Sequence, residues 1–395
     1  MRATALAAAL LLAASARAAG PGDAFLASEA IQAREVAGPL PADPGDAFWS
    51  GLPAVQVAAV PQRTLRLNDR RANEALAAAG PRSLSVRAAH DARDLGVLVE
   101  WDDATQDRMR QDATDVYGDA AAMEIPRRFG AGLRLPYVGM GDEGQPVAVS
   151  MVRATAQGVV VREAAATGFG SLARADGGGA RAAMRYDPAR GSWRALFLRP
   201  LGTGEGGLAR GLIPFALAVW DGSRQERGGN KALTRWKFLR LARYPLEQAY
   251  LTEMAWGFGP EGHGDVARGK ALVEGMCTPC HTVGERRAPV AGMAPDLSAI
   301  GAISTPGYLR DSLLDPSTVV VPSPNPAQHQ DRSRAPGVSG PYPLNEGFAW
   351  SRRDASGKAV SRMPPYAALP RPDLEAVVSY LMTLGAPAPG ERRKP

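Results

Sequence analysis

The chain has 395 residues, of which 45% are hydrophobic and 22% charged, with a formal net charge of +6. This composition is typical of a globular protein, and the length allows two or three domains. The basic residues are scattered and carry no interleaved aromatic residues, so the sequence gives no basis for nucleic-acid binding.

Residues 1–18 predict that the protein is exported. Arg2 is followed by an apolar run rich in alanine and leucine, and Ala16-Arg17-Ala18 offers the small residues of a cleavage site. This pattern is typical of a secretory signal peptide. It does not predict a membrane span, because the apolar run is too short to cross a bilayer. No later stretch reaches about 18 consecutive apolar residues, so we expect a periplasmic protein without a membrane span.

Residues 19–255 predict an antiparallel β-sandwich of about 200 residues. Two pairs of β-prone runs flank short polar turns, as in β-hairpins: 83–89 with 95–101, and 181–186 with 193–199. Further apolar, β-prone runs follow at 213–220 and 236–241. Several short strands at this spacing favour a sandwich over a helical domain.

The same region resembles the haem-binding domain of the ethylbenzene dehydrogenase gamma-subunit family. The resemblance rests on short pieces in a fixed order: 46–49, 60–62, 89–91, 99–103, 119–121, 125–126, 140–142, 146–147, 218–223, and Lys231 before Trp236. It implies a β-sandwich that holds a non-covalent haem b through a methionine and a lysine. It also implies a subunit that carries electrons for exported molybdenum enzymes of the dimethyl-sulfoxide-reductase class.

Few side chains in this region could ligate iron. His90 is the only histidine between residues 19 and 260, and the segment has no cysteine, so bis-histidine ligation is excluded. Methionine, lysine, or His90 with one of them remain. By the resemblance, Met140 and Lys231 are the ligands of haem b. Met123, for which a core role is expected, and Lys237 are the alternatives, while His90 is expected at the surface or in a cap.

The segment 256–395 centres on Cys277-Thr278-Pro279-Cys280-His281. A C-x-x-C-H run is typical of covalent haem attachment, in which both cysteines form thioethers with the haem and the histidine ligates the iron. Cys277 and Cys280 are the only cysteines, so none remains for a disulfide or an iron–sulfur cluster. A chance match or a thioredoxin-type dithiol is the alternative interpretation.

The flanks of this motif resemble class I cytochrome c over residues 264–385. The resemblance implies that the Ala294-Pro295-Asp296-Leu297 loop holds the imidazole of His281 through a proline carbonyl. It also implies that Met363, in the loop Arg362-Met363-Pro364-Pro365-Tyr366, is the second axial ligand of haem c. Met293 and Met382 are the rival methionines.

Two further features of this segment bear on its fold. Apolar residues recur at helical spacing near the C-terminus and predict a terminal helix: Leu374, Val377, Val378 and Leu381. The resemblance implies that this helix crosses the first one, with Tyr380 near Gly269. Residues 321–345 are rich in proline and serine and depart from the family, so we expect an insertion without regular structure.

We therefore expect a multidomain protein, with an antiparallel β-sandwich that carries haem b and an all-α cytochrome c domain that carries haem c. Its chemistry would be one-electron transfer between molybdopterin and iron–sulfur oxidoreductase subunits and a soluble redox carrier. The sequence leaves two alternatives open. One is a stand-alone haem enzyme, such as a small dehydrogenase or a peroxidase, and the other is a ligand-binding sandwich fused to a cytochrome c without haem b.

Overall fold

The computed structural model describes residues 20–64, 70–142, 144–168, 171–175, 179–202, 206–258, 264–290, 293–321 and 350–385. The expected signal peptide, 1–18, lies outside the described residues. The same holds for the expected insertion, 321–345, apart from Val321.

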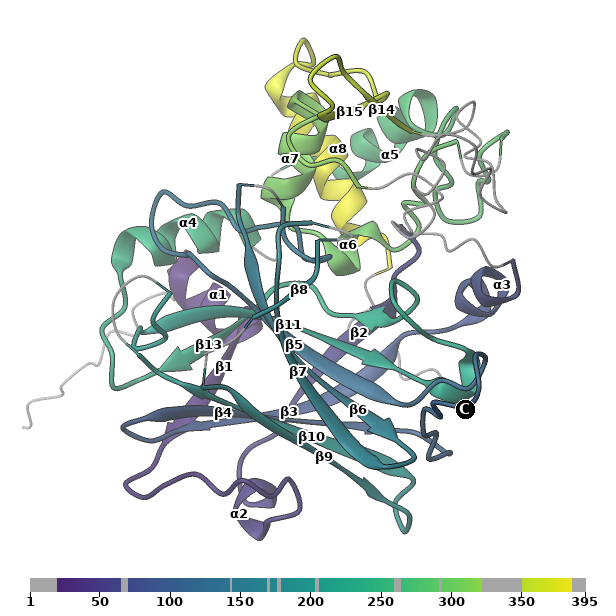
Figure 1. Cartoon of the computed structure of the whole chain (residues 1–395). Coiled ribbons are helices and arrows are strands. Elements are labelled where there is room, and N and C mark those ends of the chain that lie inside the picture. The colour runs from purple at the N-terminus through teal and green to yellow at the C-terminus, as the bar shows by residue number, and fades with distance from the viewer. Residues whose placement is uncertain are drawn as a thin grey trace, which may run out of the picture.

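The N-terminal part is built on a sheet of 13 described strands that folds into two facing layers (Figure 1). One path of hydrogen-bonded strands runs β8-β7-β6-β5-β11-β12-β2-β3-β4-β10-β9. The strands are β1 (Ala30–Glu35), β2 (Val55–Pro61), β3 (Arg82–His90), β4 (Asp94–Asp102), β5 (Ala120–Pro126), β6 (Val147–Thr155), β7 (Gly158–Ala166), β8 (Ala173–Arg174), β9 (Arg181–Asp187), β10 (Ser192–Pro200), β11 (Leu212–Trp220), β12 (Ala232–Leu233) and β13 (Lys237–Leu241).

The two expected hairpins are confirmed. Strands β3 and β4 pair antiparallel with Ala89 opposite Gly96, and β9 and β10 pair antiparallel with Tyr186 opposite Trp193. The structure adds two parallel pairs, because β1 lies beside β13 with its first residues and beside β3 with its last two. β1 therefore connects β13, which lies off this path, to β3.

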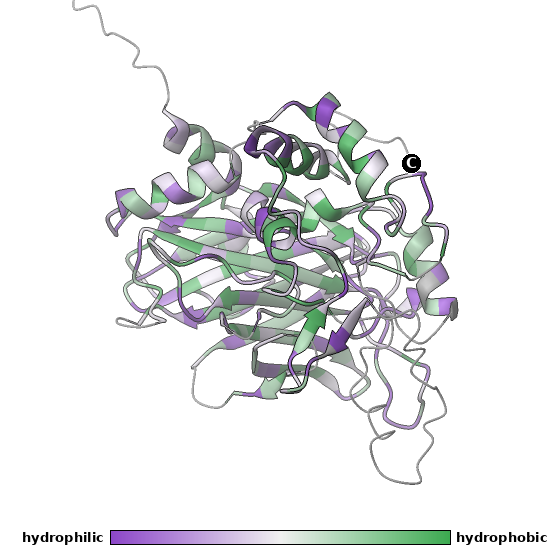
Figure 2. Cartoon of the chain, turned by 90° about the horizontal axis from the view of Figure 1, so that it is seen from above, coloured by the Kyte–Doolittle hydropathy of each residue, from purple (hydrophilic) through white to green (hydrophobic). Residues whose placement is uncertain are grey.

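The core of the sandwich lies between its layers. Every residue of β11 is buried, as expected for a central strand that is covered on both faces. Figure 2 shows the hydrophobic strands beneath the helices of the C-terminal part. The largest fully buried side chains of this region are aromatic: Trp49, Trp236, Phe25, Phe197, Phe215 and Phe238.

Short helices close the edges and ends of the sandwich. They are α1 (Pro21–Glu29), α2 (Ala47–Ser50), α3 (Arg70–Ala78), the 3-10 turn η1 (Gly222–Arg224) and α4 (Gln248–Phe258). Phe25 of α1 packs edge-on against Phe238 and Phe258, with ring centroids 4.9 and 6.1 Å away. This aromatic cluster holds α1 and α4 against β13.

The C-terminal part is helical, as expected. It contains α5 (Val266–Met276), α6 (Ile300–Ile303), α7 (Pro306–Leu314), α8 (Arg371–Thr383) and one small hairpin of β14 (Ser351–Arg353) with β15 (Ala359–Ser361). The expected crossing of the first and last helices is confirmed at Gly269, because a Cβ atom there would lie 1.9 Å from the Ala376 carbonyl oxygen and 2.9 Å from Cβ of Tyr380. Only glycine permits so close an approach of α5 to α8.

The helical part packs on the N-terminal part through α6, which lies against β2, and through α7, which lies against α4. Arg310 of α7 is buried and makes a forked ion pair with Glu375 of α8, with N–O distances of 2.7 and 2.8 Å. Its guanidinium carbon also lies 4.3 Å from the ring centroid of Trp256 in α4. One side chain thus joins two helices of the C-terminal part to a helix of the N-terminal part.

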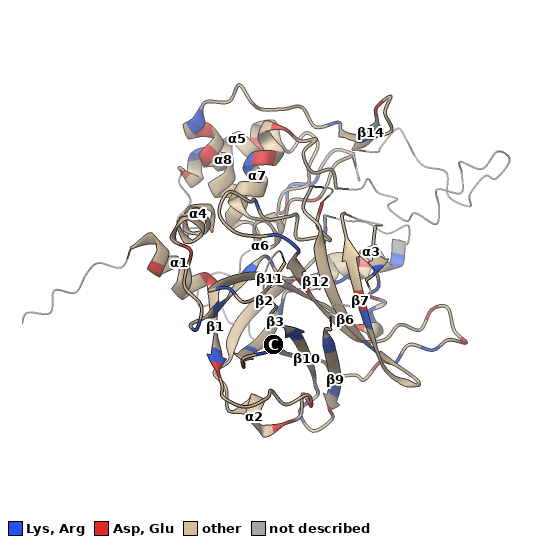
Figure 3. Ribbon diagram, turned by 60° about the vertical axis from the view of Figure 1, so that its left-hand side comes forward, with Lys and Arg blue, Asp and Glu red and all other residues tan. Residues whose placement is uncertain are grey.

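Basic and acidic residues are interspersed along the ribbon (Figure 3). This agrees with the scattered charges expected from the sequence. None of the helices in the described part of the chain has the length and the apolar character needed to cross a bilayer.

Candidate functional site

The C-x-x-C-H motif forms a tight turn at the end of α5. Cys277 caps this helix, and the backbone N–H groups of Cys280 and His281 both donate to its carbonyl, at 3.1 and 2.8 Å. Burial raises the pKa of the Cys277 thiol to about 11, and the neighbouring Cys280 adds to the rise. A redox-active dithiol requires a lowered thiol pKa, and the buried position of Cys277 shifts the thiol pKa in the opposite direction.

His281 is oriented for ligation by the predicted proline loop. Its Nδ1 atom lies 2.7 Å from the carbonyl oxygen of Pro295, so Nδ1 donates its proton there and Nε2 keeps a lone pair. The side chain is 9% exposed, and burial lowers its pKa. A histidine that ligates a metal is usually a neutral imidazole whose other ring nitrogen donates a hydrogen bond.

The Met363 loop lies close to the motif. Tyr366 donates its hydroxyl to the carbonyl of Met276, the residue before Cys277, at 3.4 Å. The backbone N–H of Met363 donates to the hydroxyl of Ser361 at 3.1 Å. The rival Met293 is 41% exposed, whereas Met363 packs against the hydrophobic core. The thiols, imidazole and thioether present therefore fit a covalent haem c.

Lys231 lies in the sandwich and is only 5% exposed. Its Nζ atom lies 5.2 Å from the ring centroid of Trp220. Burial lowers the pKa of Lys231, and the charge of Glu124 partly opposes this shift. A buried amine whose charged form is disfavoured fits a ligand of iron.

Met140 has an unusual backbone conformation at the end of the loop between β5 and β6. Its φ angle is +90°, in a region that side chains other than glycine rarely adopt and that costs about 1–3 kcal/mol. The backbone N–H of Gly168 donates to the Met140 carbonyl at 2.9 Å. Such strain is found where the surrounding structure holds a residue for a specific task.

Glu124 brings the two candidate ligands of the sandwich into one neighbourhood. Burial raises the pKa of this carboxyl group, while the charge of Lys231 and a hydrogen bond from the Met140 backbone oppose the rise. The backbone N–H of Gln62 donates to the carbonyl of Lys231 at 2.9 Å, and Asn230 precedes Lys231. Glu124, Gln62 and Asn230 each bury a side-chain oxygen without a hydrogen-bond partner among the described residues.

Sequence reasoning missed Glu124 as a site residue. A signal was present, because Glu124 is a lone acid within the run Ala120–Pro126, which is buried throughout. An ionisable side chain inside a buried strand requires a partner, so it could have pointed to a polar site. Gln62 was noticed only as one piece of the family resemblance.

The rival residues of the sandwich have other roles. Lys237 makes an ion pair with Glu29 at 2.8 Å, and Met123 is fully buried in β5, as expected for a core residue. The expectation that His90 lies at the surface or in a cap is wrong, because β3 pairs on both sides and buries it completely. His90 lies against Tyr244, near the start of β11, whereas Lys231 lies against Trp220 at its end.

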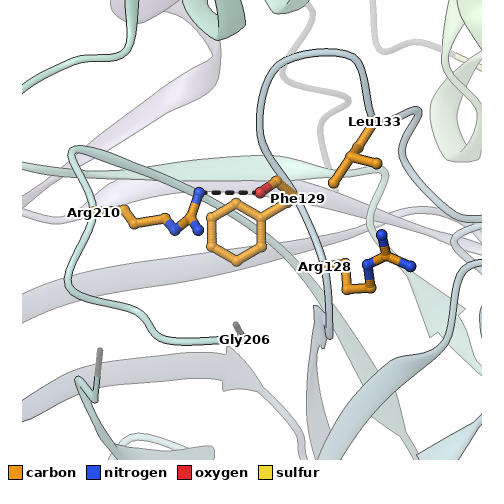
Figure 4. Close-up of a pocket in the computed structure, with 5 residues that line it drawn as sticks. All are labelled: Arg128, Phe129, Leu133, Gly206 and Arg210. Atoms are coloured by element: carbon orange, nitrogen blue, oxygen red, sulfur yellow. Dashed lines mark hydrogen bonds between the residues drawn. The ribbon is translucent and has the colours of Figure 1, made fainter. Parts of the chain in front are cut away.

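A separate pocket of about 390 Å³ lies at the start of the loop between β5 and β6 (Figure 4). It is lined by Arg128, Phe129, Leu133, Gly206 and Arg210. Arg210 donates to the carbonyl of Phe129 at 3.2 Å and lies over its ring. None of the candidate iron ligands lines this pocket, so the two haem hypotheses do not depend on it.

Comparison with known proteins assigns the chain to a family. It is 30% identical over 232 residues to the chlorate reductase gamma subunit of Ideonella dechloratans, a match that covers 57% of this chain and 90% of that protein. The chain belongs to the chlorate reductase gamma-subunit family. This finding confirms the resemblance to gamma subunits on which the assignment of Met140 and Lys231 rests.

Other matches agree with this family. The chain is 29% identical over 202 residues to a provisionally named respiratory nitrate reductase heme subunit, ORF7, of Haloferax mediterranei, covering 50% of this chain and 67% of that protein. Residues 266–385 match the cytochrome c family model. The C-terminal part of this family member is therefore a cytochrome c domain, which supports haem binding and electron transfer.

A solved structure is also similar, at low level. A family 9 carbohydrate-binding module from Caldicellulosiruptor kristjanssonii aligns with 55% of this chain and 98% of that module, at 10% identity and a TM-score of 0.32. This similarity is too low to support a carbohydrate-binding function for the sandwich.

Proposed function

We propose that this chain is an exported two-haem electron carrier. Cys277 and Cys280 attach haem c, whose iron is ligated by His281 and Met363. Met140 and Lys231 ligate the iron of a non-covalent haem b in the sandwich. The chain then passes single electrons between the redox subunits of a molybdenum oxidoreductase and a soluble acceptor in the periplasm.

The observation that carries the two-haem proposal is the environment of Lys231. An exposed lysine must release its proton before it can ligate iron, which costs about 4.6 kcal/mol at pH 7. The side chain of Lys231 is almost completely buried, and burial disfavours its charged form. Burial in the folded protein therefore lowers the free energy needed to deprotonate Lys231. An ordinary surface lysine has no such shift.

The residues of the two sites have distinct tasks in this proposal. His281 is held by the Pro295 carbonyl and would offer Nε2 to the iron of haem c, and Met363 would offer its thioether to the same iron. In the sandwich, Met140 and Lys231 would hold the iron of haem b, with Glu124 beside Lys231 and the Met140 backbone. When bound, the two irons supply reversible one-electron oxidation and reduction, and a thioether ligand raises the reduction potential.

The partner and the compartment rest on two kinds of support. Residues 1–18 have the pattern of a secretory signal peptide. The chain is similar to proteins named as reductase subunits, for chlorate and for nitrate. With both cysteines in the haem motif, the chain has none to hold an iron–sulfur cluster, so the catalytic chemistry belongs to partner subunits.

The decisive experiment counts and separates the haems of the purified exported protein. Acidified acetone should extract one haem b, while haem c stays attached to the polypeptide. Lys231→Ala should lose haem b or make its iron five-coordinate, with an unchanged haem c spectrum. Lys237→Ala is the matched control and should retain haem b, because Lys237 is engaged with Glu29.

Two outcomes would contradict the proposal. Fully loaded protein that contains haem c alone would leave the sandwich without haem b. Equal retention of haem b by Lys231→Ala and the wild type would remove Lys231 as the ligand. Acid should also weaken the haem b site selectively, because protons compete with iron for the amine.

A further inference from the structure

The loop that carries Met140 contacts the cytochrome c domain. This loop, residues 130–142, ends in the strained turn at Met140, and the side chain of Tyr137 within it meets Tyr308 of α7. We propose that α7 positions Met140 for iron ligation in the other domain, through Tyr308 and Asp311. The inference rests on the proposed function, in which Met140 ligates haem b.

The turn at Met140 is held first by local hydrogen bonds. The N–H of Gly141 donates to the Tyr137 carbonyl at 2.8 Å, and the N–H of Tyr137 donates to the carboxylate of Asp142 at 3.1 Å. Asp142 is fixed in turn by a forked ion pair with Arg134, at 2.6 and 2.9 Å. The backbone of Tyr137 is therefore tied to Gly141 and Asp142, the two residues that follow Met140, and closes the turn in which Met140 lies.

Two residues of α7 act on this arrangement from the cytochrome c domain. The rings of Tyr137 and Tyr308 have centroids 5.1 Å apart and an interplanar angle of 37°, and Tyr137 is only 3% exposed. Asp311, one helical turn after Tyr308, lies within electrostatic reach of Arg134. Helix α7 thus places the ring of Tyr308 against Tyr137 and the charge of Asp311 near Arg134.

The helix that makes these contacts is itself held firmly. Thr305 caps α7 by accepting the N–H of Tyr308 at 3.1 Å, and Arg310 joins α7 to α8 and to Trp256 of α4. A helix fixed in this way can hold a strained turn, whereas a mobile one could not. Because positive φ at a methionine is unfavourable, the turn is expected to relax when the ring of Tyr308 is removed.

The test compares Tyr308→Leu with the wild-type full-length protein. Tyr308→Phe keeps the ring and should behave as the wild type. Tyr380→Leu is the matched control, since it removes a tyrosine ring from α8 of the same domain, beside Gly269 rather than the Met140 loop. The first measurement is the rate at which haem b transfers to excess apomyoglobin. The second is hydrogen exchange of residues 136–142 in protein whose haem b has been removed by that transfer.

The expected result is faster loss of haem b from Tyr308→Leu, by about tenfold, as is typical when a residue that supports a metal ligand is removed. Exchange in residues 136–142 should also be faster. The haem c spectrum and the behaviour of the Tyr308→Phe and Tyr380→Leu variants should match the wild type. Asp311→Asn should accelerate haem b loss in the same direction to a smaller degree, and it decides the question if Tyr308→Leu fails to fold.

Wild-type rates of haem b transfer and of exchange in Tyr308→Leu would overturn the inference. If Tyr308→Leu fails to fold, wild-type rates of haem b transfer and of exchange in Asp311→Asn would overturn the inference. A wild-type protein without haem b would overturn the proposed function instead. In that case hydrogen exchange alone still shows whether α7 holds the Met140 loop.

Discussion

At the scale of single residues, burial separates candidates that the sequence leaves equivalent. Lys231 directly precedes β12 and Lys237 begins β13, yet Lys237 makes an ion pair with Glu29, whereas Lys231 lies over the ring of Trp220. Met363 and Met293 differ in the same way, because only Met363 packs against the core. When two residues have the same chemical type, their surroundings in the fold determine which of them can ligate iron.

The assignment of Met363 predicts the behaviour of Met363→Ala. The haem should stay attached through the cysteines, but the iron should gain an open position that binds imidazole or cyanide. The reduction potential should fall, because the thioether favours reduced iron. Optical titration with imidazole and potentiometry measure both effects.

Met293→Ala is the control for this experiment, because Met293 is 41% exposed. It should leave the spectrum and the potential of haem c unchanged. If Met293→Ala opened the iron and Met363→Ala did not, the assignment of the ligand would have to move to Met293.

Buried carboxyl groups of the sandwich predict a pH dependence of its stability. Asp103, Asp107, Asp119 and Asp221 place carboxylate oxygens within 4.8 Å of one another. Burial raises the pKa of Asp103 to about 6 and that of Asp119 to about 7, with further rises from neighbouring carboxylates. Since the folded state binds these protons more tightly than the unfolded state, the free energy of unfolding should fall as the pH rises from about 4 to about 7.

Asp103→Asn isolates the contribution of Asp103 to this dependence. The amide oxygen can still accept the N–H of Thr105, which lies 3.1 Å from Oδ1 in the wild type, but it does not titrate. The variant should therefore lose less stability than the wild type between pH 4 and pH 7. Urea unfolding in the presence of a chelator measures the difference, and parallel curves for the two proteins would contradict the prediction.

At the scale of elements, one close contact fixes the cytochrome c domain. Helices α5 and α8 meet where Gly269 lies against the backbone of Ala376, and both helices contribute buried residues to a common core. The Met140 loop is the corresponding element of the sandwich, since Tyr137 closes its turn by hydrogen bonds and places its ring against Tyr308 of the other domain. In each case an element far away in sequence contacts a segment near a candidate ligand.

The crossing of α5 and α8 predicts opposite effects for two glycines of α5. Gly269→Ala places a Cβ atom against the carbonyl oxygen of Ala376, a backbone atom that cannot move away as a side chain can. The free energy of unfolding of the domain should therefore fall by about 1–3 kcal/mol. At Gly275 nothing lies within 4 Å of an added Cβ atom, so Gly275→Ala should be stabilising by up to about 1 kcal/mol. Chemical unfolding followed by the haem c Soret band compares the two, and equal effects would exclude the close crossing.

At the scale of the whole molecule, the two domains form one assembly. Arg310 connects α7 to α8 through Glu375 and reaches Trp256 of α4, while Tyr308 reaches the Met140 loop. The candidate iron sites therefore belong to domains that are packed together and not only tethered by their linker. Packing of this kind suits electron transfer between two centres, because contacts between the domains limit how far the centres can move apart.

This packing predicts the effect of Arg310→Met. The substitution deprives the buried Glu375 of its guanidinium partner and should destabilise the protein by about 3–5 kcal/mol. The two domains should then unfold in separate transitions. Arg268→Met is the control, because the Arg268 side chain in the Arg268–Asp373 pair is exposed and Asp373 is only partly buried, so the unfolding temperature should stay close to that of the wild type. Differential scanning calorimetry resolves the transitions, and a single unshifted transition in Arg310→Met would contradict the prediction.

The sequence by itself determined the features that depend on local pattern. The C-x-x-C-H motif, the hairpins at β3–β4 and β9–β10 and the terminal helix α8 follow from residue spacing, and the structure contains each of these elements. Alternation and helical periodicity record which face of an element is buried, so the two-part fold could be predicted. The ordered family pieces added the candidates Met140 and Lys231.

Only the tertiary structure decided which distant residues share an environment. Nothing in the local pattern places Glu124 beside both Lys231 and the backbone of Met140, or Tyr137 against Tyr308. His90 was expected to be exposed because a polar turn follows it, but pairing of β3 on both sides buries it. Burial and pairing depend on contacts between residues far apart in the chain, and a local pattern does not contain that information.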